Sequence, residues 1–396
     1  MKKTVTLVAW IFLAVSWVSA VDMQAHIGTK EAQKAYSLYV NKQKNYYTGN
    51  YAPDVLRTKS GDALFGALNT LMGNTSRIGN SSFTYNTLRN NYVKVDKDLN
   101  VTGNIIGYYD GCSMDGTWDG GQTYNREHTW PQSKGADKGT PMGHDMQSVR
   151  PTNVAVNSDR GSTAYGEGSS FYDPDEVSID NTWYVPANLG SYRGDCARVI
   201  LYDYVVYGEA GGYKNSLYKG YAQLLNKLGK SGVFESIPIL LKWHMNDPIS
   251  LTEMVRNDGA QDYQGNRNPF IDYPELAILM LKNANGVTTY PVTTTDMTMW
   301  PAYSLTLKEG FIAYLGDKDN RPESVTVTGA NYTYDNQLGR LTITNVTGAV
   351  SIAAPIPSAL EATQDGQKAV KVIHHGQILI IKNGKAYNPF GMTVQL

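Results

Sequence analysis

One stretch of the sequence, residues 124–167, combines side-chain types that are suited to hydrolysis. It holds one imidazole, a carboxylate directly before it, one amide and two guanidinium groups, on His128, Glu127, Asn157, Arg150 and Arg160. A Ser-His-Asp triad or a nucleophilic cysteine is not suggested by this set. The chemistry to consider is therefore attack by an activated water molecule.

These groups suit the hydrolysis of a phosphodiester bond. A neutral histidine can take a proton from water near pH 7. The negative charge that develops on the phosphate is stabilised by arginine and by a divalent cation. Glu127 and Asn157 carry the oxygen atoms that a hard cation such as Mg²⁺ prefers. Each residue also has a structural alternative: His128 as a packed corner before Trp-Pro, Glu127 as an ion-pair partner, and Asn157 as a turn residue.

The backbone sets a condition on this site. Successive side chains of a regular strand point to opposite faces, so Glu127 and His128 reach one site only if the strand ends or bulges there. Pro131 follows shortly after, which is consistent with an ending strand.

The first two thirds of the sequence predict mainly helices. Leu64, Leu68 and Leu71 recur at helical spacing within residues 61–72. Helices are also expected at 198–207, where a buried strand is the alternative, at 221–228, and at 237–257 with a break at Asp247-Pro248. The Gly-rich residues 107–121 are expected to form a loop.

From about residue 286 the pattern changes to alternating strands. Residues 304–307, 325–328 and 341–344 have period two and are bounded by turn formers, which predicts a small antiparallel β module. Residues 355–358 are expected to form a linker. Two apolar segments around Asn383-Gly384 predict a β-hairpin.

Three separated motifs resemble the bacterial endonuclease I family. They are Asn-Arg-Glu-His-Thr-Trp-Pro at 125–131, Val-Arg-Pro-Thr with Val-Asn-Ser-Asp-Arg-Gly at 149–161, and Gln-Gly-Asn-Arg-Asn-Pro-Phe-Ile-Asp-Tyr-Pro at 264–274. The resemblance covers about residues 46–285. It implies an α+β fold, with a ββα-metal (His-Me finger) nuclease core surrounded by helices and followed by small all-β modules.

The resemblance also implies roles for individual residues. His128 corresponds to the general base, and Glu127 and Asn157 correspond to ligands of Mg²⁺, with Ca²⁺ or Mn²⁺ as alternatives. Cleavage would leave 5′-phosphate and 3′-hydroxyl ends. Residues expected to contact phosphate are Arg150 or Arg160 near the reacting group, with weaker contacts from Arg126 and Arg267. A packed closing loop is the alternative for Arg267.

Two features remain open in the sequence. His144 is the closest rival to His128 as the base, although it lacks a carboxylate directly before it, and Gln147 stands where many relatives have histidine or asparagine. Cys112 and Cys196 are the only cysteines of the chain, and they form either one disulfide or two buried thiols.

The chain has 396 residues and a net charge of −1, so its bulk charge does not indicate a strongly basic nucleic-acid binder. A sequence-non-specific endonuclease that contacts the backbone of DNA, and of RNA as well, is expected. The alternatives are an RNA-preferring enzyme of the same fold and a catalytically inert surface adhesion protein.

The ends of the chain suggest export. A positive start, an apolar run and a Val-Ser-Ala ending at residue 20 predict a signal peptide cleaved near Ala20, and thus a secreted monomer with no further membrane span. The predicted parts are the signal peptide 1–20, a catalytic domain 21–285, a β-rich module 286–355 and a hairpin module 356–396. The last of these resembles the C-terminal sorting modules of type IX secretion.

Overall fold

The computed structural model describes residues 30–73, 80–176, 191–207, 232–295, 297–316, 321–354, 370–374, 377–382, 385–387 and 393–394. The chain forms two compact units, Met1–Ala353 and Ala354–Leu396. The expected signal peptide, the helix at 221–228 and the linker at 355–358 lie outside the described residues. The predicted domain boundaries stay predictions.

Helices build most of the larger unit up to residue 281. They are α1 (Lys30–Tyr46), α2 (Pro53–Arg57), α3 (Gly61–Gly73), α4 (Tyr85–Arg89), α5 (Tyr92–Val95), α6 (Val154–Arg160), α7 (Arg193–Tyr207), α9 (Ile237–Asn246), α10 (Leu251–Gln264), α11 (Pro269–Asp272) and α12 (Glu275–Leu281). Short 3-10 turns are η2 (Gly49–Tyr51), η3 (Gln132–Lys134), η4 (Met142–His144) and η5 (Pro174–Glu176). The helix predicted at 61–72 and the break near residue 247 are confirmed.

Helix α7 is the central helix of this unit. Nearly all of its residues are buried, and it packs against α3, α9 and α11. A helix that is buried on every side lacks the one-sided periodicity of a surface helix. That explains why its sequence was also compatible with a buried strand.

Buried ion pairs hold α7 to its neighbours. The Nε atom of Arg198 lies 2.5 Å from Glu253 of α10, and Asp195 of α7 lies 3.4 Å from Arg150. Arg256 of α10 pairs with Asp96 at 2.7 Å. Because an unpaired buried charge is costly, this network fixes the spacing of α7, α10 and the strand that carries Arg150.

Four short strands lie among the helices. Strand β1 (Asn104–Ile106) pairs with β2 (Ser113–Asp115), and β3 (Tyr124–His128) pairs with β4 (Val149–Asn153), both in the antiparallel sense. The prediction of a loop throughout 107–121 is therefore wrong at 113–115, where a strand forms despite the surrounding glycines. Pairing with β1 outweighs the weak local preference of this segment.

Residues 290–353 form a β-sandwich of two four-stranded sheets. One sheet has the order β10-β11-β8-β6 and the other the order β7-β5-β12-β9. The strands are β5 (Tyr290–Thr295), β6 (Met299–Trp300), β7 (Leu305–Thr306), β8 (Phe311–Leu315), β9 (Thr326–Thr328), β10 (Asn331–Asp335), β11 (Arg340–Thr344) and β12 (Val350–Ala353). The module is not wholly antiparallel as predicted, because β12 runs parallel to β5.

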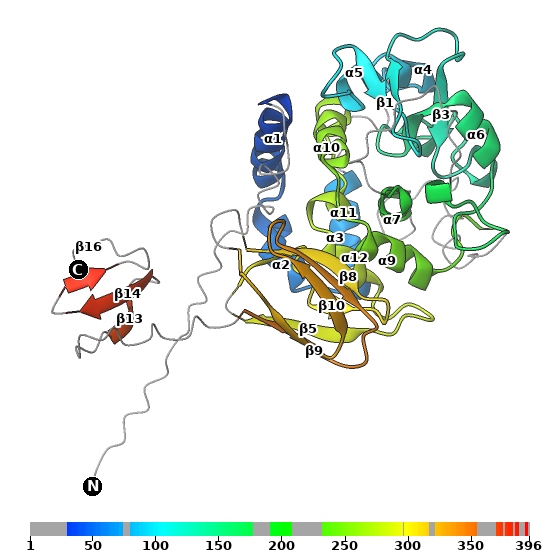
Figure 1. Cartoon of the computed structure of the whole chain (residues 1–396). Coiled ribbons are helices and arrows are strands. Elements are labelled where there is room, and N and C mark those ends of the chain that lie inside the picture. Colours follow the sequence, from blue (N-terminus) through cyan, green and yellow to red (C-terminus); the bar gives the residue numbers. More distant parts are fainter. Residues whose placement is uncertain are drawn as a thin grey trace. The chain divides into compact units, whose positions relative to one another are not determined.

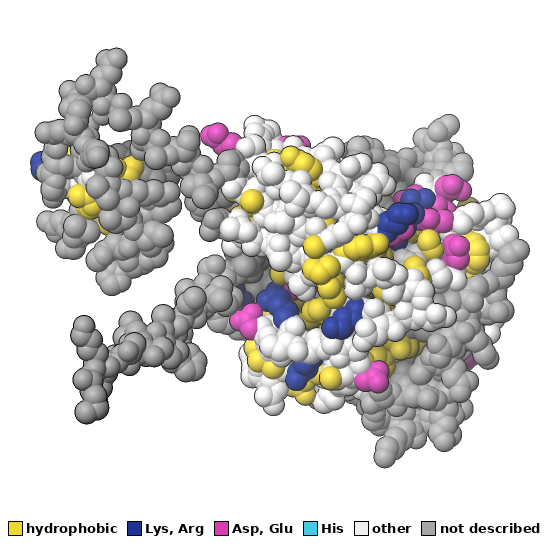
Figure 2. Space-filling view, turned by 90° about the horizontal axis from the view of Figure 1, so that it is seen from below, with side chains coloured by type: hydrophobic (Ala, Val, Ile, Leu, Met, Phe, Trp, Pro, Cys, Tyr) yellow, Lys and Arg dark blue, Asp and Glu magenta, His cyan; other side chains and the backbone are white. Residues whose placement is uncertain are grey.

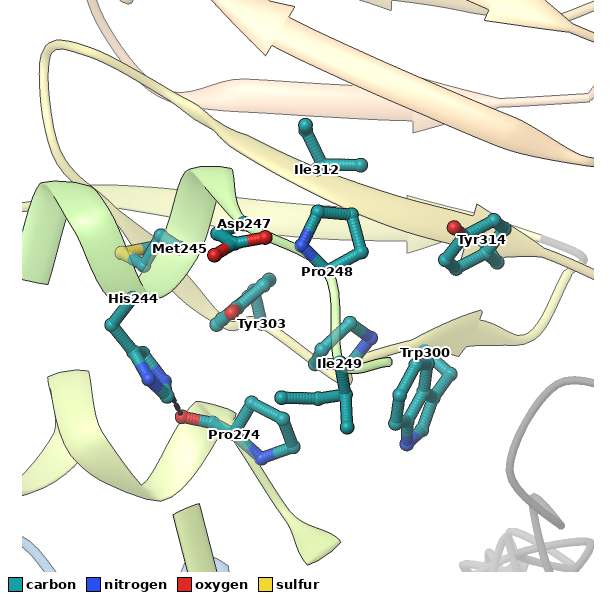
Figure 3. Close-up of a pocket in the computed structure, with 11 residues that line it drawn as sticks. His244, Met245, Asp247, Pro248, Ile249, Pro274, Trp300, Tyr303, Ile312 and Tyr314 are labelled. Atoms are coloured by element: carbon teal, nitrogen blue, oxygen red, sulfur yellow. Dashed lines mark hydrogen bonds between the residues drawn. The ribbon is translucent and has the colours of Figure 1, made fainter. Parts of the chain in front are cut away.

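The sandwich shares a hydrophobic core with the helices. Apolar side chains of α9 and α12 belong to the same buried cluster as those of β8, β11 and β12. Figure 3 shows a hollow at this contact, lined by His244 and Asp247 at the end of α9, by Pro274, and by Trp300 and Tyr314 of the sandwich. His244 is buried, and its Nε2 atom donates to the Pro274 carbonyl at 2.8 Å, so it supports this contact.

The smaller unit contains one four-stranded antiparallel sheet. Its strands are β13 (Val370–His374), β14 (Gln377–Lys382), β15 (Lys385–Tyr387) and β16 (Thr393–Val394). The predicted pairing across residues 383–384 is confirmed, with Lys382 opposite Lys385. Over the described ranges of the chain, none of the helices has the length and apolarity needed to span a lipid bilayer.

Candidate active site

Strands β3 and β4 and helix α6 form a ββα unit that carries the predicted site. The strands pair with Glu127 opposite Arg150, and Asn153 then begins α6 by accepting the backbone N–H of Ala155 at 2.8 Å. In Figure 1 this unit lies at the end of the larger unit opposite the β-sandwich, with the central helices between them. The site is thus built on a short, capped scaffold that is remote from the sandwich.

The two faces of β3 carry different groups. Asn125 and Glu127 face α6, because they contact Asn157 and Arg160, which are one helical turn apart. Arg126 and His128 lie on the other face, where both contact Tyr85 of α4. Strand β3 ends at His128, which is one of the conditions that the sequence analysis set, but Glu127 and His128 still leave the strand on opposite faces.

The carboxylate of Glu127 is buried and held by two donors. The hydroxyl of Tyr109 donates to Oε1 at 2.6 Å, and Nη1 of Arg160 lies 3.1 Å from the same oxygen. Burial raises the pKa of the Glu127 carboxyl above its usual range, while Arg160 and the Tyr109 hydroxyl act against that rise. Both of these side-chain donors gather on Oε1, so neither of them occupies Oε2.

Asn157 is oriented by its partner on β3. Its amide nitrogen donates to the side-chain oxygen of Asn125, so its own carbonyl oxygen is left for a further partner. The side chain is half-buried, whereas Glu127 is 3% exposed. A carboxylate oxygen and an amide oxygen on one side of β3 are the donor types that suit a hard divalent cation.

The ring of His128 has a defined tautomer. Its Nε2 atom lies 3.1 Å from the backbone carbonyl of Gly143, which can only accept, so Nε2 carries the hydrogen. Its Nδ1 atom, 3.2 Å from the amide nitrogen of Gln132, is therefore the basic nitrogen. Burial lowers the pKa of His128 to about 4, so the ring is neutral at pH 7.

Gly143 has a steric role in this arrangement. A Cβ atom at this position would overlap the backbone carbonyl of Asp137. The close approach of two backbone segments thus requires glycine here and brings the Gly143 carbonyl to His128.

Arg150 and Arg160 were expected to contact phosphate, and the structure buries both. Arg150 is 3% exposed and lies 3.4 Å from Asp195, with its guanidinium over the Tyr108 ring. Arg160 is 1% exposed, and besides Glu127 it donates to the backbone carbonyls of His128 and Thr129. These positions do not favour direct phosphate contact, because protein partners already enclose both groups. Arg160 instead joins α6 to the end of β3.

Arg126 and Arg267 differ from each other in accessibility. Arg267 is fully buried, with Asp272 at 2.8 Å and Asp258 at 2.7 Å, which favours the closing-loop alternative over phosphate contact. Arg126 is half-buried on the face of β3 that carries His128. Among the predicted arginines it is the one whose position remains compatible with phosphate contact.

The cysteines are free thiols, so the disulfide alternative is corrected. Cys112 and Cys196 are buried in different hydrophobic clusters, and Cys196 accepts a hydrogen bond from the Tyr108 hydroxyl at 3.2 Å. Two thiols enclosed by separate cores do not meet. His144, the rival base, is half-buried in η4.

Four residues that contact the site were missed by the sequence analysis, namely Tyr109, Asn125, Gln132 and Gly143. Asn125 and Gln132 lie within or beside the motif that was identified, and the period of two in β3 would have placed Asn125 with Glu127. Tyr109 and Gly143 come from loops whose course depends on packing, so their contacts had no signal in the spacing of residues.

Among the described residues there is no group of three or more His, Cys, Asp or Glu side chains placed to hold a metal ion. Figure 2 views the larger unit from below Figure 1, on the side away from the ββα unit, and basic and acidic side chains on that face lie scattered among neutral ones. This agrees with the nearly balanced composition.

Comparisons with known proteins identify the class. The sequence model of the family described as endonuclease I matches residues 61–275. The chain is 33% identical over 228 residues to the extracellular ribonuclease of Bacillus amyloliquefaciens, an alignment that covers 55% of this chain and 74% of that protein. It is 32% identical over 228 residues to the extracellular ribonuclease of Bacillus subtilis (strain 168), with the same coverage.

A ββα unit that carries a neutral imidazole, a buried carboxylate and an amide thus occurs in a chain related to nucleases. The chain belongs to the endonuclease I family. It is a nuclease that hydrolyses phosphodiester bonds, and nucleic acid is its substrate.

Proposed function

We propose that this nuclease is an exported, Mg²⁺-dependent endonuclease that cuts DNA and RNA without sequence specificity, leaving 5′-phosphate and 3′-hydroxyl ends. The observation that carries the proposal is the tautomer of His128. The Gly143 carbonyl takes the Nε2 hydrogen, which leaves a basic Nδ1 one residue from Glu127. A neutral imidazole with a fixed tautomer can accept a proton from water at pH 7.

The residues divide the work as follows. His128 takes the proton of the attacking water at Nδ1, and the Gln132 amide, which now donates to that atom, must move aside for the water. Glu127 and Asn157 would hold the divalent cation, which supplies charge stabilisation for the phosphate and the leaving 3′-oxygen. Tyr109 and Arg160 keep the Glu127 carboxylate in place, and Asn125 does the same for the Asn157 amide.

Broad substrate use follows from what the site lacks. Within the described residues of 121–270, the helices α6, α7, α9 and α10 are not strongly basic, which supports contact with the backbone rather than base readout. The names of both relatives, extracellular ribonuclease, favour RNA preference as the second candidate.

The decisive experiment is digestion of plasmid DNA and total RNA by the purified protein, with Mg²⁺ or with EDTA. Cleavage of both substrates that EDTA abolishes is expected. Cleavage of RNA alone would select the RNA-preferring enzyme, and cleavage that persists in EDTA would contradict the metal dependence. Mapping the new ends with a phosphatase-sensitive labelling reaction tests the proposed 5′-phosphate.

Export is proposed on separate grounds. Both relatives are named as extracellular, and residues 1–20 have the pattern of a signal peptide. The sheet of residues 370–394 stays a predicted sorting module. Determining the N-terminal residue of the mature protein, expected to be Val21, tests the cleavage site. Deletion of residues 356–396 should retain the enzyme in the cell if that module directs sorting.

A further inference from the structure

The face of β3 that carries His128 also carries a row of alternating arginine and aromatic side chains. We define this row, the arginine–aromatic ladder, as Arg89, Trp118, Arg126 and Tyr85. The guanidinium of Arg89 lies 5.2 Å from the centre of the Trp118 ring, and that of Arg126 lies 5.0 Å from it. Arg126 also lies 3.6 Å from the centre of the Tyr85 ring.

The ladder leads directly to the candidate base. The ring of Tyr85 stacks on that of His128, with 5.5 Å between centroids and 29° between planes. Tyr85 and Arg89 are one turn apart on α4, and Arg126 and His128 are two apart on β3, so both elements present a single face to the ladder. Each of the four ladder side chains is half-buried and therefore still reaches the surface.

The positive charges of the ladder have no carboxylate partner. No ion pair to Arg89 or Arg126 is found in the ranges that the structure describes. Asp119 follows Trp118 in the same loop, but its carboxylate accepts the backbone N–H groups of Gly121, Gln122 and Thr123. The two arginines thus differ from Arg150, Arg160 and Arg267, which are paired with acids.

Arg126 is held while part of its guanidinium stays available. Its Nη1 atom donates to the Tyr85 carbonyl at 2.8 Å and lies 3.3 Å from Asn86 Oδ1. Its Nε atom is buried and has no hydrogen-bond partner in the described residues. Because rings and one carbonyl fix the plane of this group, little side-chain entropy remains to be lost when Nη2 contacts an anion.

We propose that the arginine–aromatic ladder is the track for the sugar–phosphate backbone of the substrate strand, with one phosphate at Arg126 and a further one at Arg89. This inference rests on the proposed function and names a subsite for it. The aromatic rings hold the two guanidinium groups in place by stacking against them. Position 89 therefore requires the planar guanidinium of arginine and not only a positive charge.

The test measures binding without cleavage. Wild-type protein and the variants Arg89→Ala and Arg89→Lys are titrated with fluorescently labelled single-stranded RNA and DNA in EDTA, over a series of salt concentrations. Arg89→Ala should weaken binding roughly tenfold, the effect of losing one charge-assisted contact. The slope of log affinity against log salt should become shallower by about one phosphate contact, roughly 0.7 for a single strand.

The second variant tests the bracing. Arg89→Lys should restore most of the salt slope but only part of the affinity, because lysine lacks the planar fork that stacks on Trp118. Equal affinities of Arg89→Lys and the wild type would contradict the claim that Trp118 braces the guanidinium. An unchanged slope of log affinity against log salt in Arg89→Ala would contradict the claim that Arg89 contacts a phosphate. Lys308→Ala, which removes an exposed charge on the sandwich, is the matched control and should keep the wild-type slope.

Failure of this inference can be told from failure of the proposed function. The binding assay contains no divalent cation and does not depend on turnover. If wild-type protein cleaves nucleic acid with Mg²⁺ while Arg89→Ala binds like wild type, only the ladder is disproved. Melting temperatures of all variants must agree within a few degrees, since Arg89 is half-buried and makes no buried ion pair.

Discussion

At the scale of single residues, His128 shows how the backbone can assign a chemical role. The Gly143 carbonyl determines which ring nitrogen carries the hydrogen, and the burial that lowers the pKa of the ring keeps it neutral. Sequence motifs identified His128 and Glu127, but the tautomer depends on a carbonyl in a loop that no spacing rule places.

His128→Ala should lower kcat roughly 10²–10⁴-fold, because a positioned general base contributes about that much to the rate. Nuclease assays at saturating substrate measure the effect. His144→Ala is the control and should retain wild-type turnover. If the loss occurs in His144→Ala instead, the base is His144.

Tyr109 has an unusual backbone conformation. Its φ of 75° is rare for a bulky side chain, and it is buried with its hydroxyl on Glu127. Such a conformation persists only where surrounding contacts enforce it. The tight fit of this loop beneath the carboxylate suggests that Tyr109 serves the site rather than the fold.

Tyr109→Phe keeps the ring and removes the hydroxyl. Loss of a group that orients a metal ligand should weaken cation affinity about 10–100-fold. Calorimetric titration with Mn²⁺ measures this directly, and the Mg²⁺ dependence of activity provides a second readout. Tyr172→Phe is the matched control, because its ring packs 5.4 Å from that of Tyr109 while its buried hydroxyl has no hydrogen-bond partner in the described residues. Equal Mn²⁺ affinities in the two variants would contradict the role of Tyr109.

At the scale of elements, the sequence predicted helices α3, α7, α9 and α10 and the alternating strands, because these follow from local periodicity, but it did not predict α1, the longest of the described helices. It failed where tertiary contacts decide. Strand β2 forms in a Gly-rich segment by pairing with β1. Strand β12 pairs with β5 in parallel, and the alternating pattern of a strand does not indicate whether its neighbour runs parallel or antiparallel. Arg150 looked like a phosphate ligand because its acidic partners Asp195 and Asp96 lie far away in the sequence.

His244, near the end of α9, should make the free energy of unfolding depend on pH. His244 is 1% exposed, its Nδ1 has no partner in the described residues, and burial lowers its pKa to about 3. A histidine with a pKa near 6.5 in the unfolded chain and a lower one in the fold stabilises above pH 6.5, and that stabilisation is lost as the pH falls toward 3.

His244→Gln keeps a donor for the Pro274 carbonyl but cannot titrate. Between pH 7 and pH 5 the free energy of unfolding of the wild type should therefore fall by about 2 kcal/mol more than that of the variant. Urea unfolding at the two pH values measures the difference. Parallel losses in both proteins would show that His244 does not become charged on unfolding.

At the scale of the whole molecule, the ββα unit and the sandwich occupy opposite ends of one unit, yet α9 and α12 join them through a common core. Sequence composition separates the sandwich from the helices at about residue 286. It does not reveal that their apolar surfaces cover each other, because surface complementarity is a property of the folded chain.

Two truncations test this dependence. Deletion of residues 354–396 should leave the melting temperature and the nuclease activity of the larger unit unchanged, because those residues form a separate compact unit. Deletion of 286–396 should expose apolar residues of α9 and α12 and lower the melting temperature by more than about 10 °C, or cause aggregation. Thermal unfolding followed by circular dichroism measures both. A stable, active 21–285 fragment would show that the nuclease core folds without the sandwich.

The parallel pair β5–β12 has a consequence for the order in which this enzyme matures. Strand β12 lies at the middle of its sheet, between β5 and β9, yet it is the last strand of the sandwich to leave the ribosome. Until residue 353 appears, that sheet lacks the strand that joins β5 to β9. The larger unit can thus complete its fold only after almost all of its residues have been synthesised.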